Sequence, residues 1–455
     1  MRINLGTPMR LSEIAHAVGG RLLIGEDPTI YCISTDTREL HPSDLFIAIK
    51  GETYDGETFV KEAKETGAYA LSGCKDNADI YHADSITALL SLAEYYIKSL
   101  PIILYKIGIT GSVGKTTTKE FLNILLSKSY KCHISQGNHN NHIGMPMSIL
   151  SAPRDTQILI MEMGMNHAGE IRRLTNCLKP NLAVITNIGS AHIGNLGNRE
   201  NIAKAKLEIV EGMTDGRIIV PFDEPLLKIA KNRVTFSLSS PDSDYYFKVR
   251  DNEFSAFNHG NFILKSNFNL EEQHNQFCLA VAVAAAMETG VSSDDLAKGI
   301  SSISRYNTRQ RVCFMENYIF YTDFYNASFE SVIAFIHEAE EHPENTNKSL
   351  VIGDMLELGI MSRDIHFRIG SSISKSTFKN LFLVGKDAIH IAEGALKNGF
   401  PEEKIFYNPD PQSPALTASQ IRKNCNAGDI IFMKGSRGIK LERILSCFDA
   451  EREKE

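Results

Sequence analysis

The chain has 455 residues, of which 43% are hydrophobic and 23% charged, an ordinary globular balance that excludes a disordered chain. A net charge of −7 gives no global attraction to nucleic acid or to an anionic membrane, so neither is an expected partner. The longest apolar run, residues 277–287, is shorter than the roughly 20 residues of a membrane span, and the N-terminus lacks a signal pattern. The eight cysteines form no CxxC pair, so we expect a cytoplasmic protein with reduced thiols.

The first hundred residues predict a small domain of their own. Residues 11–18 read as a short helix and residues 43–49 as a strand, and a longer helical stretch covers residues 85–99. Pro101 follows that helix and marks a boundary. Because domain-size statistics favour about three domains for this length, we predict domains over 1–100, 101–314 and 315–455.

The remaining chain alternates apolar strands with helices. Residues 157–161 and 182–186 are strand-like runs closed by polar residues, which predicts a mostly parallel sheet with helices on both faces. After a basic and polar run at 305–311, further buried-strand runs appear at 349–352, 381–384 and 430–433. The predicted fold class is therefore α/β throughout, and ligands are expected at the carboxyl ends of the strands.

A glycine-rich loop stands between a strand and the helix at 119–126. It reads T-G-S-V-G-K-T-T and lacks the first glycine of the strict phosphate-loop pattern, because position 109 is Ile. Glycines let backbone N–H groups turn toward an anion, and the helix start adds a favourable dipole. We therefore predict ATP binding, with the Thr116 hydroxyl on Mg²⁺, by Thr110, Gly111, Ser112, Val113, Gly114, Lys115, Thr116 and Thr117.

Two polar residues follow the next strands. Glu162 comes at a strand end beside the phosphate loop, where a Mg²⁺ ligand belongs because hard cations prefer oxygen. A helix-capping or solvated acid is the less favoured alternative for this residue taken alone. His192 follows the next strand, and because a lone histidine is more often a structural hydrogen-bonding group than a ligand, both roles stay open for it.

The stretch 201–213 predicts a helix with a lysine on its apolar face. Ile202, Lys206, Ile209 and Met213 share one face, whereas Lys204 aligns with Glu208 and Glu211 on a face expected to be solvated. An isolated buried ammonium is costly or has a lowered pKa. A neutral amine reacts with CO₂ to give a carbamate, which suits Mg²⁺. The alternative, that the ammonium reaches out to water, is favoured by periodicity alone.

The order of motifs resembles that of the Mur ligases of peptidoglycan synthesis, the enzymes that build cell-wall precursors needed for cell shape and division. The central part shows the family's phosphate loop, its asparagine-rich loop, its two metal-side strand ends and its lysine box, at 110–117, 137–146, 162–171, 186–192 and 206–209. The flanking parts show similar boxes at 34–38, 45–48, 51, 55–56, 323–327, 353–359, 366 and 434–438. Three residues depart from the family's pattern, namely Gly194, His274 with no glycine two residues before it, and Cys278.

The resemblance implies an ATP-dependent ligase that forms an amide bond through an acyl phosphate. The boxes at 323–327, at 353–359 with His366, and at 434–438 resemble those of the branch that joins D-alanyl-D-alanine to UDP-N-acetylmuramoyl-tripeptide. It implies an N-terminal uridine-nucleotide domain, a central phosphate-loop domain and a C-terminal Rossmann-like domain that brings the dipeptide.

The resemblance also implies residue roles. One Mg²⁺ is expected on Thr116 and Glu162, and a second near His192 and a carbamylated Lys206, with Lys115, Glu162, His192 and Lys206 as catalytic residues. Further ATP contacts are expected from Asn275, Asp323 and Arg309, the last preferred over Arg311 on spacing. The residues expected to bind the two acceptor substrates are Thr35, Asp36, Arg38, Lys50, Gly51, Asp55, Asn138, Asn140, Asn141, Asn326, Lys434, Ser436 and Arg437.

Other functions stay open at this point. One alternative is a ligase of the same architecture that adds glutamate to a folate, or a single amino acid to a muramoyl peptide. From a different class, the phosphate loop would serve an ATP-driven switch or motor, or a catalytically silent nucleotide-binding relative. We expect the chain to act as a monomer.

Overall fold

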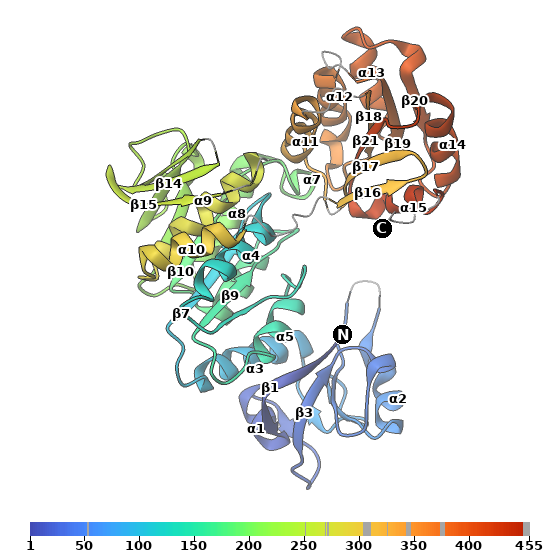
Figure 1. Ribbon diagram of the computed structural model, residues 1–455. Coiled ribbons are helices and arrows are strands. Elements are labelled where there is room, and N and C mark those ends of the chain that lie inside the picture. Colours follow the sequence, from blue (N-terminus) through green and yellow to red (C-terminus); the bar gives the residue numbers. More distant parts are fainter. Residues whose placement is uncertain are drawn as a thin grey trace, which may run out of the picture. The chain divides into compact units, whose positions relative to one another are not determined.

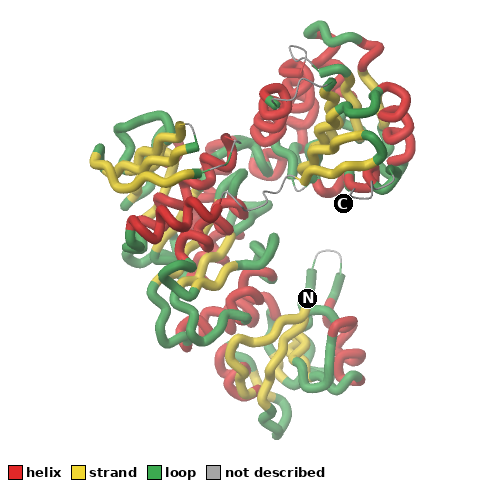
Figure 2. The backbone as a smooth tube through the Cα atoms, viewed as in Figure 1, coloured by secondary structure: helices red, strands yellow, loops and turns green. Residues whose placement is uncertain are grey.

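The computed structural model describes residues 1–51, 54–250, 252–268, 270, 273–303, 311–324, 326–342, 347–373 and 378–448. The chain divides into two compact units, residues 1–187 with 203–304, and residues 188–202 with 305–455. Three separate sheets with helices packed on them run through these units (Figures 1 and 2), which confirms the predicted α/β class. Among the described residues, no helix has both the length and the apolar character needed to cross a bilayer.

The first sheet contains six strands in the order β1-β3-β4-β5-β6-β2. The predicted helices at 11–18 and 85–99 are confirmed, and Asp84 caps the second by accepting from the backbone N–H groups of Ile86 and Thr87. The elements are β1 (Arg2–Arg10), α1 (Leu11–Ala17), β2 (Arg21–Leu22), β3 (Thr29–Ser34), β4 (Leu45–Ile47), α2 (Val60–Glu65), β5 (Tyr69–Ser72), β6 (Ile80–Tyr81) and α3 (Ser85–Ser99).

The second sheet has nine strands in the order β15-β14-β13-β12-β11-β10-β7-β9-β8. Strands β7 to β13 run parallel, and β14 and β15 extend the sheet as an antiparallel hairpin. Its strands are β7 (Tyr105–Thr110), β8 (Cys132–Ile134), β9 (Ile158–Glu162), β10 (Leu182–Ile185), β11 (Arg217–Pro221), β12 (Arg233–Ser237), β13 (Tyr245–Arg250), β14 (Glu253–Asn258) and β15 (Asn261–Asn267). Its helices are α4 (Lys115–Leu126), α5 (Gly144–Leu150), α6 (Glu170–Leu178), α8 (Arg199–Leu207), α9 (Gln273–Met287) and α10 (Ser293–Ile303). The short helix α7 (Ile193–Leu196) belongs to the second unit.

Helices cover both faces of this sheet, as the alternating pattern predicts. Ile107 and Ile109 of β7 join a buried cluster with residues of α4, α9 and α10 on one face. Gly108, which lies between them, points to the other face, where a Cβ would lie 3.1 Å from Met163 and 3.3 Å from Ile209. Because β9, β7 and β10 are adjacent parallel strands, their carboxyl ends lie together at one edge of this covered sheet.

The third sheet has six strands in the order β16-β17-β21-β18-β19-β20, and only β16 is antiparallel to its neighbour among the strands described. It begins at Arg311, ahead of the domain start expected at residue 315. Its elements are β16 (Arg311–Met315), β17 (Tyr318–Asp323), α11 (Phe329–Glu341), β18 (Lys348–Gly353), α12 (Ser362–Ile373), β19 (Asn380–Val384), α13 (Ile389–Lys397), β20 (Ile405–Asn408), α14 (Pro414–Asn424), β21 (Ile430–Lys434) and α15 (Glu442–Leu445).

Two predicted helices have different bounds in the structure. The helix after the phosphate loop begins at Lys115, four residues before the expected start at 119, because the loop's last glycine lies directly before it. The helix predicted over 201–213 ends at Leu207 and continues as a 3₁₀ turn, η3 (Glu208–Val210). This change of helix type rotates the side chains after Leu207 away from the positions that a continuous α-helix assigns to them.

Candidate active site

The phosphate loop is held against the end of β10. Gly111 has a φ of +149°, and a Cβ there would lie 1.9 Å from the Thr186 hydroxyl oxygen, so only glycine fits. The Asn187 side-chain oxygen accepts from the backbone N–H groups of Ser112 (3.1 Å) and Val113 (3.0 Å). Strand β10 therefore sets the shape of the loop, although the glycine pattern alone predicts its place.

The start of α4 provides the positive end of the site. The Lys115 ammonium donates to the Gly111 carbonyl oxygen at 2.8 Å, so its side chain folds back over the loop. The Thr110 hydroxyl is buried and has no hydrogen-bond partner among the described residues. A lysine, a helix start and a free hydroxyl at one strand end suit the binding of phosphate groups.

Helix α9 begins beside the same loop. Gly114 has a φ of +82°, and a Cβ there would lie 2.9 Å from the Cys278 sulfur. The Cys278 thiol lies 3.8 Å from the Gly114 carbonyl oxygen. The small thiol therefore fits closely against the loop, and Asn275, one turn earlier on the helix, is buried.

Glu162 and Thr116 meet, as the predicted magnesium site requires. Glu162 ends β9 and is 1% exposed, and its carboxylate accepts from the Thr116 hydroxyl at 2.6 Å. Its other oxygen accepts from the Asn140 side-chain N–H at 2.8 Å. A buried carboxylate next to a hydroxyl is an oxygen donor set that fits Mg²⁺. The solvated-acid alternative for Glu162 is wrong because the side chain is buried.

Lys206 is fully inside the protein. Its side chain is 1% exposed, and burial, with a smaller contribution from the charge of Lys115, lowers its pKa well below the usual 10.5. The alternative in which the ammonium reaches water is therefore wrong. A lysine with a lowered pKa holds a larger fraction of neutral, nucleophilic amine.

Glu208 does not belong to a solvated ion-pair face, which corrects the sequence prediction. Its side chain is buried and binds the start of α6, accepting from the backbone N–H groups of Gly169 (2.8 and 3.0 Å) and Arg172 (3.1 Å). Glu211, by contrast, is exposed and pairs with the Arg172 guanidinium. The α8 helix pattern contained no sign of this partner, because α6 is distant in the sequence.

His192 belongs to the second unit and contacts a glutamate there. It has a φ of +64°, and its Nδ1 lies 2.6 Å from the Glu357 carboxylate. The same segment is bound twice more, because Glu330 accepts from the Ser190 N–H and hydroxyl, both at 2.9 Å, and the Glu357 carbonyl accepts from the Gly194 N–H at 3.1 Å. A Cβ on Gly194 would lie 2.5 Å from that carbonyl, so this position requires glycine here.

Of the predicted metal ligands, only Thr116 and Glu162 are in direct contact in the residues that the structure describes. No group of three or more His, Cys, Asp and Glu residues with the geometry of a metal site occurs there. Lys206 is near enough to Lys115 for their charges to interact. The role of His192 and Lys206 at a second metal therefore stays a prediction.

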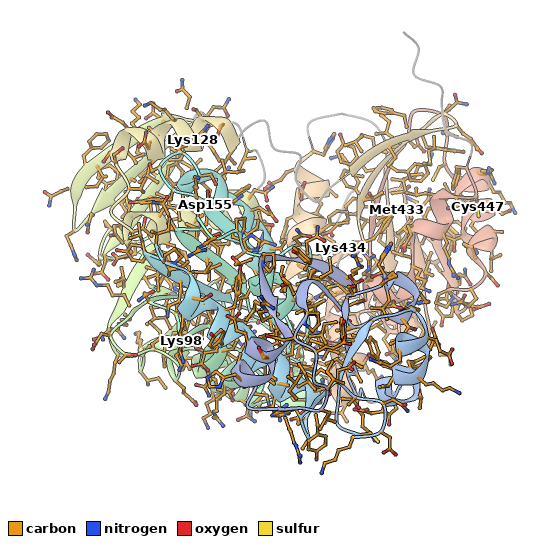
Figure 3. The ribbon with its side chains drawn as sticks, turned by 90° about the horizontal axis from the view of Figure 1, so that it is seen from below. Lys98, Lys128, Asp155, Met433, Lys434 and Cys447 are labelled. Atoms are coloured by element: carbon orange, nitrogen blue, oxygen red, sulfur yellow. The ribbon has the colours of Figure 1, made fainter. Side chains whose placement is uncertain are left out.

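The predicted residues of the C-terminal domain come together at the strand ends. Lys434 (labelled in Figure 3) is the last residue of β21 and is 2% exposed. Its ammonium donates to the Asp323 carboxylate and to the Asn326 carbonyl oxygen. The Ser436 hydroxyl accepts from the Leu356 N–H at 3.0 Å. Three loops that follow β17, β18 and β21 are thus tied together, while Arg437 is exposed.

The loops after β3 and β4 of the N-terminal domain carry two ion pairs. Arg38 binds the Asp36 carboxylate at 2.6 Å and lowers its pKa to about 2, and Lys50 lies 3.0 Å from Asp55. Burial raises the pKa of Tyr54, and both aspartates raise it further, so the two loops are close to the same phenol. Thr35 and Gly51 lie in these loops, and Lys50 also lines a 460 Å³ pocket with Ala48, Glu57, Gly73, Cys74, Ala83, Asp84, Ser85 and Ile86.

Two of the three predicted asparagines have structural contacts. Asn140 binds Glu162, and the Asn141 side chain accepts from the N–H groups of Ile143 and Gly144 where α5 begins, whereas Asn138 is exposed. Arg309 lies outside the described residues. Sequence reasoning missed Lys119, a fully buried lysine on α4, for which its place on the buried side of an amphipathic helix was the only signal.

Comparison with known proteins agrees with this geometry. Three domain families match the chain: the Mur ligase family, catalytic domain, at residues 29–94; the Mur ligase middle domain at 109–286; and the Mur ligase, glutamate ligase domain, at 305–437. The chain therefore belongs to the Mur ligase family, which confirms the resemblance and the ligase class.

The relatives are named as one kind of ligase. The UDP-N-acetylmuramoyl-tripeptide–D-alanyl-D-alanine ligase of Bacillus subtilis is 37% identical over 96% of this chain and 97% of its own, and that of Treponema pallidum is 30% identical over 92% and 94%. A crystal structure of MurF from Acinetobacter baumannii has a TM-score of 0.86 and 27% identity, covering 98% of this chain and 99% of its own. MurF from Thermotoga maritima in complex with ADP has a TM-score of 0.77 and 26% identity, covering 91% and 96%.

Proposed function

We propose that the chain is the ATP-dependent ligase that joins D-alanyl-D-alanine to UDP-N-acetylmuramoyl-tripeptide in the cytoplasm, a step of peptidoglycan synthesis. Its nearly full-length similarity to ligases of that name supports the substrates. The contact of Thr116 with the buried Glu162, beside a phosphate loop, is the observation that supports ATP-dependent chemistry.

The proposed reaction first activates a carboxylate for attack by an amine. A carboxylate is a poor electrophile because its leaving group would be oxide. Transfer of the γ-phosphoryl group of ATP to the terminal carboxylate of the tripeptide forms an acyl phosphate and releases ADP. The amine of D-alanyl-D-alanine then attacks the carbonyl carbon, phosphate leaves from the tetrahedral intermediate, the nitrogen loses a proton, and an amide bond results. Positioning and charge neutralisation account for most of such catalysis.

The residues of the phosphate loop supply that neutralisation. Lys115 and the loop's N–H groups bind the β- and γ-phosphates, with Asn275, Asp323 and Arg309 as further contacts of the nucleotide. Thr116 and Glu162 would hold one Mg²⁺, and His192 and Lys206 a second. When bound, Mg²⁺ would supply positive charge that offsets the repulsion of the phosphate and carboxylate groups. The oxygen donors and the free Thr110 hydroxyl support this assignment.

Lys206 is proposed to carry a carbamate. Its nitrogen attacks the carbon of CO₂ and loses a proton, which converts a buried amine into an oxygen-donor anion. Complete burial and the lowered pKa favour the neutral amine that this step needs. Lys206→Ala should abolish ligation and regain part of it with a small added carboxylate, and ¹³C-bicarbonate should give the folded wild type a carbamate NMR signal that the variant lacks. An active variant without that signal contradicts the carbamate.

The two flanking domains are proposed to bring the acceptors. Thr35, Asp36, Arg38, Lys50, Gly51 and Asp55 border the region proposed for the uridine nucleotide, next to the 460 Å³ pocket. Asn138, Asn140 and Asn141 belong to the loop proposed for the peptide part. Asn326, Lys434, Ser436 and Arg437 would serve D-alanyl-D-alanine, and closure over the site would keep water from the acyl phosphate.

Mass spectrometry of the product tests the function. Incubation with Mg-ATP, UDP-N-acetylmuramoyl-tripeptide and D-alanyl-D-alanine should yield the pentapeptide, ADP and phosphate in equal amounts. Replacing the dipeptide by single amino acids, or the tripeptide by a folate, should give no product. An amide product with those replacements supports a ligase of another specificity, and rapid ATP hydrolysis without any acceptor supports a switch or motor.

A further inference from the structure

A buried lysine on α4 lies outside the roles assigned so far. Lys119 is 0% exposed and comes one turn after Lys115 of the phosphate loop. Its ammonium donates to the carbonyl oxygen of Ser135 and, at 3.3 Å, to that of Gly137. It also lies 3.2 Å from the Glu120 carboxylate. A buried ammonium is stable only when its N–H groups have acceptors and its charge has a partner. Here two backbone oxygens of one loop are the acceptors, and the Glu120 carboxylate lies next to the charge.

These carbonyls belong to a segment that we call the asparagine loop, residues 135–141. It follows β8 and precedes α5, and Gly137 in it has a φ of +49°. Its exposed tip at Asn138 comes directly after the second carbonyl that Lys119 binds. The lysine therefore acts on the loop backbone next to the position at which the loop meets solvent.

The other end of the asparagine loop is bound to the active-site carboxylate. There, Asn140 donates to the Glu162 carboxylate at 2.8 Å. The Gly164 N–H donates to the Asn140 carbonyl oxygen at 2.8 Å, and a Cβ at Gly164 would lie 2.7 Å from the Asn140 side chain. The loop thus has two anchors, Lys119 at its start and the residues around Glu162 at its end.

We propose that Lys119 is a positioning residue that holds the start of the asparagine loop in the shape that binds the nucleotide-peptide acceptor. The ammonium performs the role of a tethered monovalent cation, since it binds the backbone oxygens of buried Ser135 and of exposed Gly137 at once. This inference rests on the proposed function, because it concerns the acceptor of that reaction. The proposal predicts that Lys119 affects the binding of the acceptor but not of the nucleotide, because the nucleotide-binding residues Lys115 and Thr116 lie on the preceding turn of α4.

The first test compares two equivalent charge removals. Lys119→Met keeps the length of the side chain and removes its donors, and Lys131→Met makes the same change at an exposed lysine just before β8. Loss of hydrogen bonds from a charged donor should raise the KM for the tripeptide substrate about tenfold or more in Lys119→Met. The affinity for ADP should not change, and Lys131→Met should match the wild type. Hydrogen exchange of residues 136–141 should be faster in Lys119→Met only.

The second test restores the cation without the side chain. Lys119→Ala opens a cavity next to the two carbonyls, and added n-propylammonium should lower the KM for the tripeptide substrate again, whereas sodium should not. Lys119→Arg, which keeps the charge, should keep part of the acceptor affinity. If Lys119→Met does not fold, Lys119→Ala and Lys119→Arg still test whether this cation positions the loop.

Three results overturn the proposal. They are an unchanged KM in a folded Lys119→Met, a loss of ADP affinity as large as the loss of acceptor affinity, and slow loop exchange in every variant. Because the exchange and ADP measurements need no ligation, they remain informative if the wild type forms no pentapeptide. That outcome would contradict the proposed function and leave the effect of Lys119 on the loop measurable.

Discussion

Glu208→Ala should destabilise the central domain far more than the same change at the neighbouring Glu211. Both glutamates face Arg172 at the start of α6, but they differ in what else they bind. The buried Glu208 carboxylate accepts from the N–H groups of Gly169 and Arg172, whereas the exposed Glu211 binds only the Arg172 guanidinium in the described contacts. The pair therefore forms a matched comparison of a buried helix cap and a surface ion pair.

The expected magnitudes follow from these contacts. Removal of a side-chain acceptor at a helix start costs about 0.5–2 kcal/mol, and loss of a partly buried charge at the positive end of the helix dipole costs up to about 2 kcal/mol. Glu208→Ala should therefore lower the free energy of unfolding by up to about 4 kcal/mol. Glu211→Ala loses an exposed pair, which is worth at most about 1 kcal/mol.

Urea denaturation of the full chain, followed by circular dichroism, measures the difference between the two variants. Hydrogen exchange localises it, because the N–H groups of Gly169 and Arg172 lose their acceptor only in Glu208→Ala. Their protection should fall in that variant and stay at the wild-type level in Glu211→Ala. Glu208→Gln, which keeps one acceptor oxygen and loses the charge, should lie between them. Equal losses of stability in the two alanine variants, or unchanged protection in Glu208→Ala, would refute the assignment of Glu208 as the cap.

Three further predictions concern the site and the thiols. Because burial lowers the pKa of Lys206, this residue binds fewer protons in the folded than in the unfolded state between its folded pKa and 10.5. The stability of the wild type should therefore rise with pH in that range, and Lys206→Met should remove this rise and be more stable than the wild type at neutral pH. Unfolding midpoints in CO₂-free buffer measure both effects. Gly111→Ala, whose Cβ would meet Thr186, should weaken ADP binding about tenfold or more by calorimetry, and an unchanged affinity contradicts the strained loop. Exposed Cys74 should react with a thiol reagent well before Cys177, whose pKa burial raises to about 12, and peptide mapping that finds the reverse order contradicts the burial.

Local patterns were enough to predict much of the fold. The helix expected over 85–99 has those bounds in the structure, because its N-cap aspartate and its apolar period are neighbours in the sequence. The place of the phosphate loop was predictable for the same reason, since its two glycines, lysine and threonine lie within a few residues of one another. The unusual position of Lys206 on an apolar stripe also indicated that this lysine needs an explanation other than solubility.

Patterns within one helix failed where the partner lies elsewhere in the chain. The spacing of Glu208 with Lys204 predicted a solvated face, but a 3₁₀ turn and the start of α6 gave the carboxylate a buried partner. Lys119 looked like an ordinary second lysine of α4 after Lys115, and only the folded chain shows that its ammonium binds loop carbonyl oxygens. His192 was predicted as a metal ligand, and the glutamate beside its ring could not be inferred from its own strand end.

The amino-acid order alone was sufficient for the α/β class, the phosphate loop and the family resemblance, because each depends on residues within a few positions of one another. Tertiary structure decided which polar groups are buried and what satisfies them: Glu162 by Thr116 and Asn140, Glu208 by α6, and Lys119 by the asparagine loop. The physical reason is that the energy of a buried charge depends on the groups around it in space. Those groups come from other strands and helices, whose approach no local period records.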